Sequence, residues 1–552
     1  MQRLADDTWV MSASDLTQLS HCPWLVARKI DEKLAKGVSV PDLTDPMMEL
    51  VKRLGISHEE RVLEQLQNTL DQVVEIPYDR SVSSKDPALW KTNISAAATQ
   101  TVEALGSGAD AIFQGVFFQE NLPDTPLTVA FQGFADFLVR GERGWEVWDS
   151  KLARSAKDPA LIQVAAYADQ LVRLGIHTSP EVRLVLGDGT HSIHEVEPLI
   201  GQYGDQRQEL LRLLEERVND PNATPWDDKR YVACGTKGCP ACAEQIALTD
   251  DLFQVAGLRK TQRSKLKVAG FHTLTEFANA TRQEVLSQTT GIGQDTLAQL
   301  HTQALLQRKT QDNPHERPVW SVLSSKMLNT LPPVSPGDLF FDFEGDPTYQ
   351  EFDSHNRPLG GLSSGDQTVW FGIEYLFGLW GAHLDPSTDQ PGFVSLWAEN
   401  FAEEKQALLD FCALVEQRLE KFPDLHIYHY ASYERTRLAV LTDRHQVAQE
   451  TVDRLLNGVL VDLYPIVMKG VRIGLPSYSL KALEALYFEP GTRSGIAGGG
   501  ESVAAFVDYL DALSAGNHDQ ALAIKNSILH YNTLDCFSTE ALRNWLLDIK
   551  NS

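Results

Sequence analysis

Two acidic residues alternate with aromatic ones in an apolar segment of the chain's second half. The segment reads LFFDFEGDP (339–347), and its short, apolar, aromatic-rich composition predicts a β-strand. Residues i and i+2 of a strand point the same way, so Asp342 and Glu344 emerge on one face. Burying two neighbouring carboxylates is costly unless a metal ion neutralises them. The segment therefore predicts a metal site on a buried strand.

The same half of the chain ends in a helical pattern, ILHYNTLDCFSTEALRNWL, which carries Tyr531 and Asp535. Residues four apart share one face of a helix, so these two side chains are expected to point the same way. Between the strand and the helix, HIYHYASYERTRLAVL contains His429 and Glu434, and Asp462 follows an apolar stretch. These residues are further candidates for a carboxylate cluster.

This set resembles the DEDD exonucleases of the RNase H-like fold, in the subgroup that carries a tyrosine, over about residues 336–552. The resemblance implies that the carboxylates hold Mg²⁺ or Mn²⁺ and that Tyr531 orients or helps deprotonate the attacking water. It also implies cleavage from a free end in the 3′ to 5′ direction. Glu434 stands where the family has an Asp, and His429 where it has an Asn. Asp462 is the other candidate ligand.

The first half of the chain contains a second acidic pattern. The segment VAFQGFADFLVRGERGWEVWDSKLAR predicts two strands joined by a turn at residues 140–144. Asp136 lies near the end of the first strand, and Asp149 and Lys151 share a face of the second. Two carboxylates can hold Mg²⁺ or Mn²⁺, and a lysine can position water or neutralise developing charge. The pattern is that of a phosphodiester-cleaving site.

Two helical patterns flank these strands. LIQVAAYADQLVRLG places Gln163 and Tyr167 on one face, and LGISHEERVLEQL carries His58. The ordered set from His58 to Tyr167 resembles the RecB-type PD-(D/E)XK nucleases, closest to the branch with the CRISPR-associated RecB-like exonucleases. The resemblance covers about residues 1–245 and implies a restriction-endonuclease-like α/β fold. It implies that His58, Asp136 and Asp149 contact the metal, and that Lys151, Gln163 and Tyr167 complete the site.

Four of the six cysteines form a metal-binding pattern. Cys234, Cys239 and Cys242 lie close together in sequence, and Cys22 is the distant fourth thiol. Four thiolates suit tetrahedral zinc or a [4Fe–4S] cluster, and their spacing does not choose between the two. The RecB-like resemblance implies a [4Fe–4S] cluster that joins the two ends of the nuclease domain; zinc is the alternative.

Between the two nuclease-like regions, residues 246–315 have helical patterns. Gly291-Ile292-Gly293 resembles the hairpin of helix-hairpin-helix modules, which contact phosphates through backbone amides. A basic run, comprising Arg259, Lys260, Arg263, Lys265 and Lys267, fits a phosphate path, although a plain helical spacer would also explain it. Residues 316–335, rich in Pro and Ser, predict a linker.

Composition limits the classes of function. The net charge of −26 and a pI near 5.0 argue against a passive nucleic-acid coat, but a nuclease needs clustered carboxylates. An apolar run of about 18 residues is missing, as is an apolar signal-peptide core, so we expect a cytoplasmic protein that does not contact a membrane.

Together these patterns predict a multidomain α/β protein with a restriction-endonuclease-like domain, a helical region, a linker and an RNase H-like domain. The expected function is a metal-dependent nuclease on DNA that is single-stranded or has free ends, in repair, recombination or defence. The alternatives are a non-catalytic nucleic-acid-binding scaffold, or RNA trimming by the C-terminal domain. Because the sequence has no G-x-x-x-x-G-K-[ST] phosphate loop, the family analogy suggests a helicase or recombination partner in trans.

Overall fold

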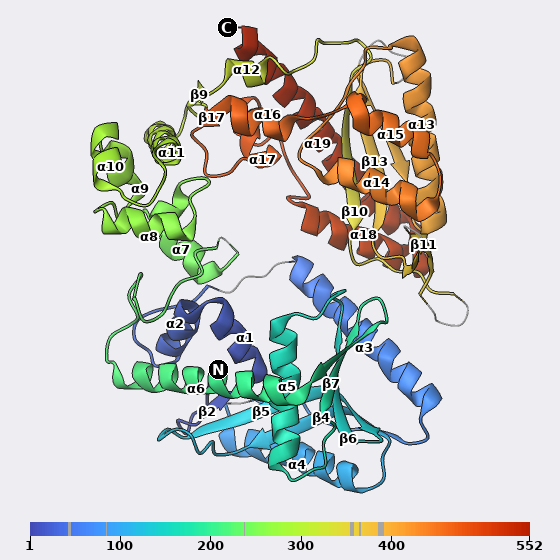
Figure 1. Cartoon of the computed structure of the whole chain (residues 1–552). Helices are drawn as coiled ribbons and strands as arrows, with labels where there is room; N and C mark the ends of the chain where they lie inside the picture. Colours follow the sequence, from blue (N-terminus) through green and yellow to red (C-terminus); the bar gives the residue numbers. More distant parts are fainter. Residues whose placement is uncertain are drawn as a thin grey trace. The chain divides into compact units, whose positions relative to one another are not determined.

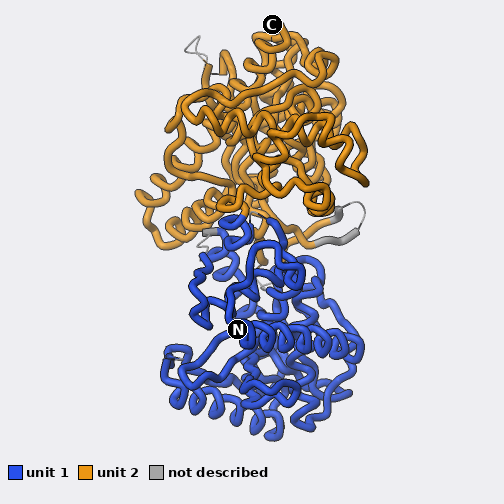
Figure 2. The backbone as a smooth tube through the Cα atoms, turned by 90° about the vertical axis from the view of Figure 1, so that its left-hand side faces the viewer, with its two compact units in different colours: residues 1–245 blue, residues 246–552 orange. Residues whose placement is uncertain are grey.

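The computed structural model describes residues 1–41, 46–83, 85–236, 238–353, 358–363, 366–384 and 391–551. The chain divides into two compact units, residues 1–245 and 246–552 (Figure 2). No helix in the described ranges combines the length and the apolar character that crossing a membrane requires.

A mixed eight-stranded sheet forms the centre of the first unit. Its strands are β1 (Gln2–Arg3), β2 (Trp9–Met11), β3 (Val73–Glu75), β4 (Ala111–Gln119), β5 (Val129–Gly141), β6 (Gly144–Lys151), β7 (Glu181–Leu186) and β8 (His191–Glu195). The long strand β5 pairs with β4 along one edge. On its other edge it pairs first with β2 and then with β6, and the β5–β6 hairpin is the one that the sequence predicts.

Several helices of the first unit accompany this sheet (Figure 1). They are α1 (Ala13–His21), α2 (Pro23–Lys33), α3 (Pro46–Thr69), α4 (Pro87–Gly106), α5 (Asp158–Arg173) and α6 (Val196–Asn219), and α7 (Pro240–Leu248) follows across the sequence boundary of the two units. Helix α5 packs on β5, β6 and β7, while α4 packs on β4. Val62 and Leu66 of α3 are buried against Phe137 and Val139 of β5, which fixes α3 across the strand that carries Asp136.

The second unit begins with a group of helices around a small core of their own. These are η1 (Leu252–Gln254), α8 (Lys260–Val268), α9 (Leu274–Asn279), α10 (Arg282–Gln288) and α11 (Gln294–Asp312). Gln303 of α11 donates a hydrogen bond to the Ile473 carbonyl at 2.8 Å and accepts one from the Tyr478 hydroxyl, also at 2.8 Å. The helical region is thereby fastened to the rest of its unit.

The predicted linker, residues 316–335, is instead ordered structure. It contains β9 (Trp320–Val322), which pairs with β17 (Val471–Ile473), and the short helix α12 (Ser325–Leu328). Leu328 and Leu331 are buried in the core beneath α16 (Leu463–Gly470). Ser324 caps α12, and the two leucines are held by a core assembled from distant residues.

A five-stranded sheet carries the rest of the second unit, in the order β14-β13-β10-β15-β16. The strands are β10 (Leu339–Asp346), β13 (Ile373–Gly381), β14 (Gly392–Trp397), β15 (Ile427–His429) and β16 (Leu460–Asp462), and β11 (Gly360–Ser363) and β12 (Asp366–Val369) form a separate hairpin. β10 pairs antiparallel with β13 and parallel with β15. It is therefore a central strand.

The remaining helices cover the two faces of this sheet (Figure 1). They are α13 (Phe401–Lys421), α14 (Tyr433–His445), α15 (Gln449–Arg454), η2 (Leu455–Val459), α17 (Leu480–Leu483), η3 (Glu484–Leu486), α18 (Gly499–Ser514) and α19 (His518–Asn551). Phe341 and Phe343 of β10 pack with Phe411 of α13, while Phe340 belongs to the core that contains Leu542 of α19. By strand alternation, Asp342 and Glu344 lie on the α19 face.

Candidate functional site

Three carboxylates meet where strand β10 faces helix α19. Asp342, Glu344 and Asp535 each offer an oxygen, and these atoms lie within 4.8 Å of one another. The side chains of Glu344 and Asp535 are buried, and Asp342 is largely covered. A buried triad of this kind matches the ligand set that Mg²⁺ or Mn²⁺ prefers.

Asn532, which sequence reasoning missed, is hydrogen-bonded to two carboxylates of this triad. Its Nδ2 donates to Asp342 Oδ2 at 2.8 Å and to Glu344 Oε1 at 3.4 Å. Gly378 of β13 stands opposite Asp342, and a Cβ placed on it would lie 1.6 Å from Asn532 Oδ1. The glycine makes room for the amide that orients the two carboxylates. The available signal was a polar residue one helical turn before Asp535.

The electrostatics of the triad favour a bound cation. Burial, reinforced by Asp535, raises the pKa of Glu344 to about 8. Burial and the neighbouring carboxylates also raise the pKa of Asp342 well above its ordinary value. Such groups resist ionisation until a positive charge joins them. The residues present therefore fit a divalent metal ion.

Two cationic side chains border the triad. Arg493 forms an ion pair with Asp535 and another with Glu484 at 2.5 Å. Lys481 donates to the Tyr531 hydroxyl at 2.7 Å. Burial and the charge of Asp535 raise the pKa of Tyr531, so this hydroxyl keeps its proton. Sequence reasoning left Lys481 unassigned and missed Arg493. Its partners Asp535 and Glu484 lie 42 and 9 positions away in the sequence.

The two remaining candidates of this half lie beside β15. Glu434, in the first turn of α14, is buried, and its Oε2 lies 3.1 Å from His429 Nδ1. Its charge contributes to the raised pKa of Asp342, so it lies near the triad without joining the group of ligand atoms defined above. Asp462 caps α16, and its Oδ1 accepts hydrogen bonds from the backbone amides of Ala431 and Tyr464, each at 2.9 Å.

Residues 339–547, which include the triad and both of these candidates, match the family model of the RNase H superfamily. The C-terminal part of the chain is an RNase H-like domain. With its acidic triad, the RNase H-like domain suggests a phosphodiester hydrolase acting on nucleic acid. A comparison of the chain with the curated proteins finds no match. The N-terminal unit is a separate mixed α/β domain without a family assignment.

In the N-terminal unit, Asp149 is the centre of a hydrogen-bonded group. It is fully buried on β6, with Lys151 Nζ 2.5 Å from its Oδ2. Gln163 of α5 donates to Asp149 Oδ1 at 3.2 Å and lies 3.4 Å from the Tyr167 hydroxyl. Gly133 of β5 lets the Tyr167 ring approach, since a Cβ there would lie 2.7 Å from it. The structure brings these four predicted residues together.

Asp136 and two residues of helix α3 lie near the group around Asp149. Ser150 donates to Asp136 Oδ2 from its backbone amide at 2.8 Å and from its hydroxyl at 2.9 Å. Burial, then the charge of Asp136, raises the pKa of Glu59 to about 7. His58 instead lies with Nε2 3.1 Å from the Val185 carbonyl oxygen. Glu59, adjacent to His58 in sequence, is thus a carboxylate that sequence reasoning passed over.

The N-terminal carboxylates also repel one another. Burial and the charge of Asp136 raise the pKa of Asp149 to about 8, despite the ion pair with Lys151. Burial disfavours the Lys151 ammonium, but Asp149 and Asp136 outweigh it and raise the pKa of Lys151. The lysine therefore stays charged. Among the described residues, the groups of three or more His, Cys, Asp or Glu side chains whose ligand atoms lie within 4.8 Å of one another do not include these carboxylates.

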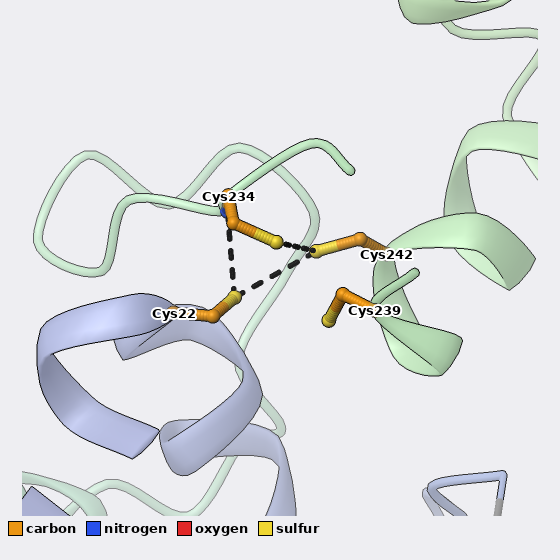
Figure 3. Close-up of side chains that lie close together, drawn as sticks. All are labelled: Cys22, Cys234, Cys239 and Cys242. Carbon is orange, nitrogen blue, oxygen red and sulfur yellow. Dashed lines mark hydrogen bonds between the residues drawn. The ribbon is translucent and has the colours of Figure 1, made fainter. Parts of the chain in front are cut away.

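The four predicted cysteines lie together in the N-terminal unit (Figure 3). Cys22 Sγ is 3.7 Å from Cys242 Sγ, and Cys234 Sγ is 3.6 Å from Cys242 Sγ. The backbone amides of Leu25 and Cys234 both donate to Cys22 Sγ at 3.4 Å, which favours its thiolate. Cys412 and Cys536 are buried elsewhere, as expected of core residues.

The spacing of these sulfurs bears on which metal they fit. Four thiolates at about 2.3 Å from one tetrahedral ion stand roughly 3.8 Å apart. The observed separations of 3.6 and 3.7 Å are close to that value. A four-iron cluster would need the sulfurs farther apart, because its core lies between them. The four residues fit either metal chemically, and their present spacing fits a single ion.

Most of the predicted basic run in the helical region is bound within the protein. Arg263 is buried and donates from Nε to Asp251 Oδ1 at 2.7 Å, and Lys267 pairs with the same carboxylate at 3.2 Å. Lys265 donates to the Gly291 carbonyl in the predicted hairpin. These three residues hold the hairpin and η1 to α8. The phosphate path along the basic run stays a prediction.

Proposed function

We propose that this chain is a metal-dependent nuclease that acts on DNA with single-stranded or free ends, with one site in each unit. The observation that carries the proposal is the convergence of Asp342, Glu344 and Asp535 in an RNase H-like domain. Triads of buried carboxylates have a high free energy without a cation, and their retention in a core is explained by metal chemistry.

At the C-terminal site, a bound divalent ion would activate water and stabilise the leaving oxygen. The chain's own residues orient the reactants. Asn532 fixes Asp342 and Glu344, while Lys481 holds the Tyr531 hydroxyl. Because Tyr531 keeps its proton, it acts as a hydrogen-bond donor that orients the attacking water. Removal of nucleotides from a 3′ end is the direction that the DEDD resemblance supports.

At the N-terminal site, the arrangement supports a RecB-like PD-(D/E)XK assignment. Asp136, Asp149 and Glu59 are the groups that would hold a divalent ion. Lys151, kept charged by its neighbours, would stabilise negative charge on the phosphate. Gln163 positions Asp149 through its 3.2 Å hydrogen bond. His58 bonds to a backbone carbonyl, which supports a role in fixing α3 to β7.

The cysteine group supports a structural metal centre. It joins the segment around residue 22 to residues 234–242, and thus the two ends of the N-terminal unit. The RecB-like resemblance favours a [4Fe–4S] cluster, and the sulfur spacing favours zinc. Either would fix two distant segments of chain without taking part in cleavage.

An end-labelled nuclease assay tests the proposal. Full-length protein is incubated with single-stranded DNA or RNA, labelled at either end, in Mg²⁺ or Mn²⁺. We expect Lys151→Ala and Asp342→Asn each to remove one component of cleavage, and the double variant to remove both. Equal, negligible cleavage by the wild type and the double variant would favour a binding scaffold. Cleavage of RNA that survives Lys151→Ala would assign RNA trimming to the C-terminal site.

A further inference from the structure

A cavity of about 560 Å³ lies beside the N-terminal carboxylates. Its lining includes Tyr78, Phe134, Gln132, Gln163 and Tyr167. The volume falls in the range of about 300–1,000 Å³ that is usual for small-ligand sites. Two of these residues, Gln163 and Tyr167, already belong to the group around Asp149.

The cavity follows an open edge of strand β5. On this edge β2 pairs with β5 as far as Phe131, and β6 pairs with it from Phe137 onward. Within the described residues, positions 132–136 have no partner strand there. Phe134 lines the cavity, and Asp136 lies two residues farther along the strand. A rise of about 3.4 Å per residue puts about 7 Å between the two positions. The cavity and the carboxylate are therefore neighbours along one stretch of β5 that has no partner strand on this edge.

The chemistry of the lining is that of a base-binding pocket. The rings of Tyr78 and Phe134 have centroids 5.1 Å apart and are inclined by 49°. The Arg80 guanidinium lies 5.7 Å from the centre of the Phe134 ring. Arg80 also donates to Gln114 Oε1 at 2.9 Å, and Gln114 in turn donates to Glu59. Aromatic faces with an adjacent arginine bind unpaired bases and their phosphates.

The amides complete this set. Gln132 and Gln163 line the same cavity, and a side-chain amide can pair with the hydrogen-bonding edge of a base. In a duplex that edge is occupied by the partner base, and both faces are covered by stacking. A base that enters the cavity must therefore be unpaired and unstacked.

We propose that this cavity binds an unpaired base of single-stranded nucleic acid, next to the phosphodiester that reaches Asp136 and Asp149. Tyr78 and Phe134 provide the stacking surfaces, and Arg80 neutralises a neighbouring phosphate. The proposal rests on the proposed nuclease function of this unit and adds the residues that hold the base next to the cleaved bond.

The test uses full-length protein and oligonucleotides with 2-aminopurine at successive positions from the end, in Ca²⁺ in place of Mg²⁺. Stacking quenches this fluorophore, so we expect quenching at one particular position. We expect Tyr78→Ala and Phe134→Ala to weaken that binding by about tenfold, the scale of one lost base–aromatic stack. Tyr78→Phe and Phe134→Tyr keep a ring and are the matched controls that should retain it.

A kinetic measurement separates this proposal from the nuclease proposal. In an Asp342→Asn background, Tyr78→Ala should raise KM for single strands about tenfold and leave kcat nearly unchanged. If Phe134→Ala does not fold, the partly exposed Tyr78 carries the test. Unchanged quenching and KM in Tyr78→Ala, with cleavage still dependent on Lys151, would overturn the base pocket and leave the nuclease intact. Position-specific quenching without cleavage would support the pocket and refute the nuclease.

Discussion

Asn532 of helix α19 donates a hydrogen bond to Asp342 of strand β10 at 2.8 Å, in space that Gly378 leaves open. We predict that Gly378→Ala displaces the amide, because the new Cβ would overlap Asn532 Oδ1. Mn²⁺ affinity, measured by calorimetry, should fall about tenfold or more, since misplaced ligands lose metal affinity on this scale. Affinity equal to that of the wild type would show that the amide does not orient the triad.

A second prediction concerns metal binding by the triad itself. Asp342→Asn removes one ligand charge, so the rise in melting temperature of the wild type on adding Mn²⁺ should become smaller. A ligand at about 100 times its Kd stabilises a protein by about 2.7 kcal/mol. Glu540→Gln, on the same helix but outside the triad, is the control. A full Mn²⁺ shift in Asp342→Asn would contradict the site.

The third prediction is a pH dependence. Glu344 has a pKa of about 8 in the folded, metal-free protein and an ordinary value of 4.5 when unfolded. Between these values the folded state binds more protons than the unfolded state. The free energy of unfolding should therefore decrease as the pH rises from about 5 to about 8. Urea unfolding without Mg²⁺ or Mn²⁺ measures this slope.

Glu344→Gln supplies the comparison for that slope. The amide does not titrate, so this variant should lose less stability over the same pH range. Mg²⁺ or Mn²⁺ affinity of the wild type should rise with pH, because the metal must displace protons. Equal slopes in the two proteins would show that Glu344 is already ionised in the metal-free fold.

A fourth prediction separates two adjacent residues of α3. Glu59→Gln should lower cleavage by the N-terminal site about 100-fold or more, as expected for loss of a group that acts on the reacting centre. His58→Gln should affect stability more than cleavage, because His58 Nε2 lies 3.1 Å from a backbone oxygen. Single-turnover assays in an Asp342→Asn background measure both. A larger loss of cleavage in His58→Gln than in Glu59→Gln would instead assign the functional role to His58.

The fifth prediction concerns the thiolates. The Cys22→Ser protein should lose the metal and have a lower melting temperature. A metal held by Cys22 and the three later cysteines ties the start of the N-terminal unit to its end. Cys412→Ser is the matched control. Metal analysis of anaerobically purified wild type, with absorbance near 400 nm, distinguishes one zinc from four irons. A metal-free wild type would refute the centre altogether.

Much of the acidic geometry follows from local sequence. The strand alternation places Asp342 and Glu344 on one face, and helical spacing relates Tyr531 to Asp535. In the same way Asp149 and Lys151 share a face of β6, and their contact at 2.5 Å agrees with that expectation. Periodicity sets the direction of side chains within one element, so these relationships need no knowledge of the tertiary fold.

The residues that were missed depend on contacts between distant segments. Glu59 lies near Asp136 only because Val62 and Leu66 pack α3 across β5. Arg493 meets Asp535 from a loop 42 residues away. The segment expected to be a linker is ordered because Leu328 and Leu331 pack into a core made by residues later in the chain.

By itself, then, the sequence determined which acids and thiols this protein has and which of them share a strand or helix face. The tertiary structure decided that α3 offers Glu59 near Asp136, that Asn532 donates to Asp342 and Glu344, and that a cavity lies beside β5. The physical reason is that burial, cation pairing and pocket shape are produced by packing between elements, which local periodicity does not encode.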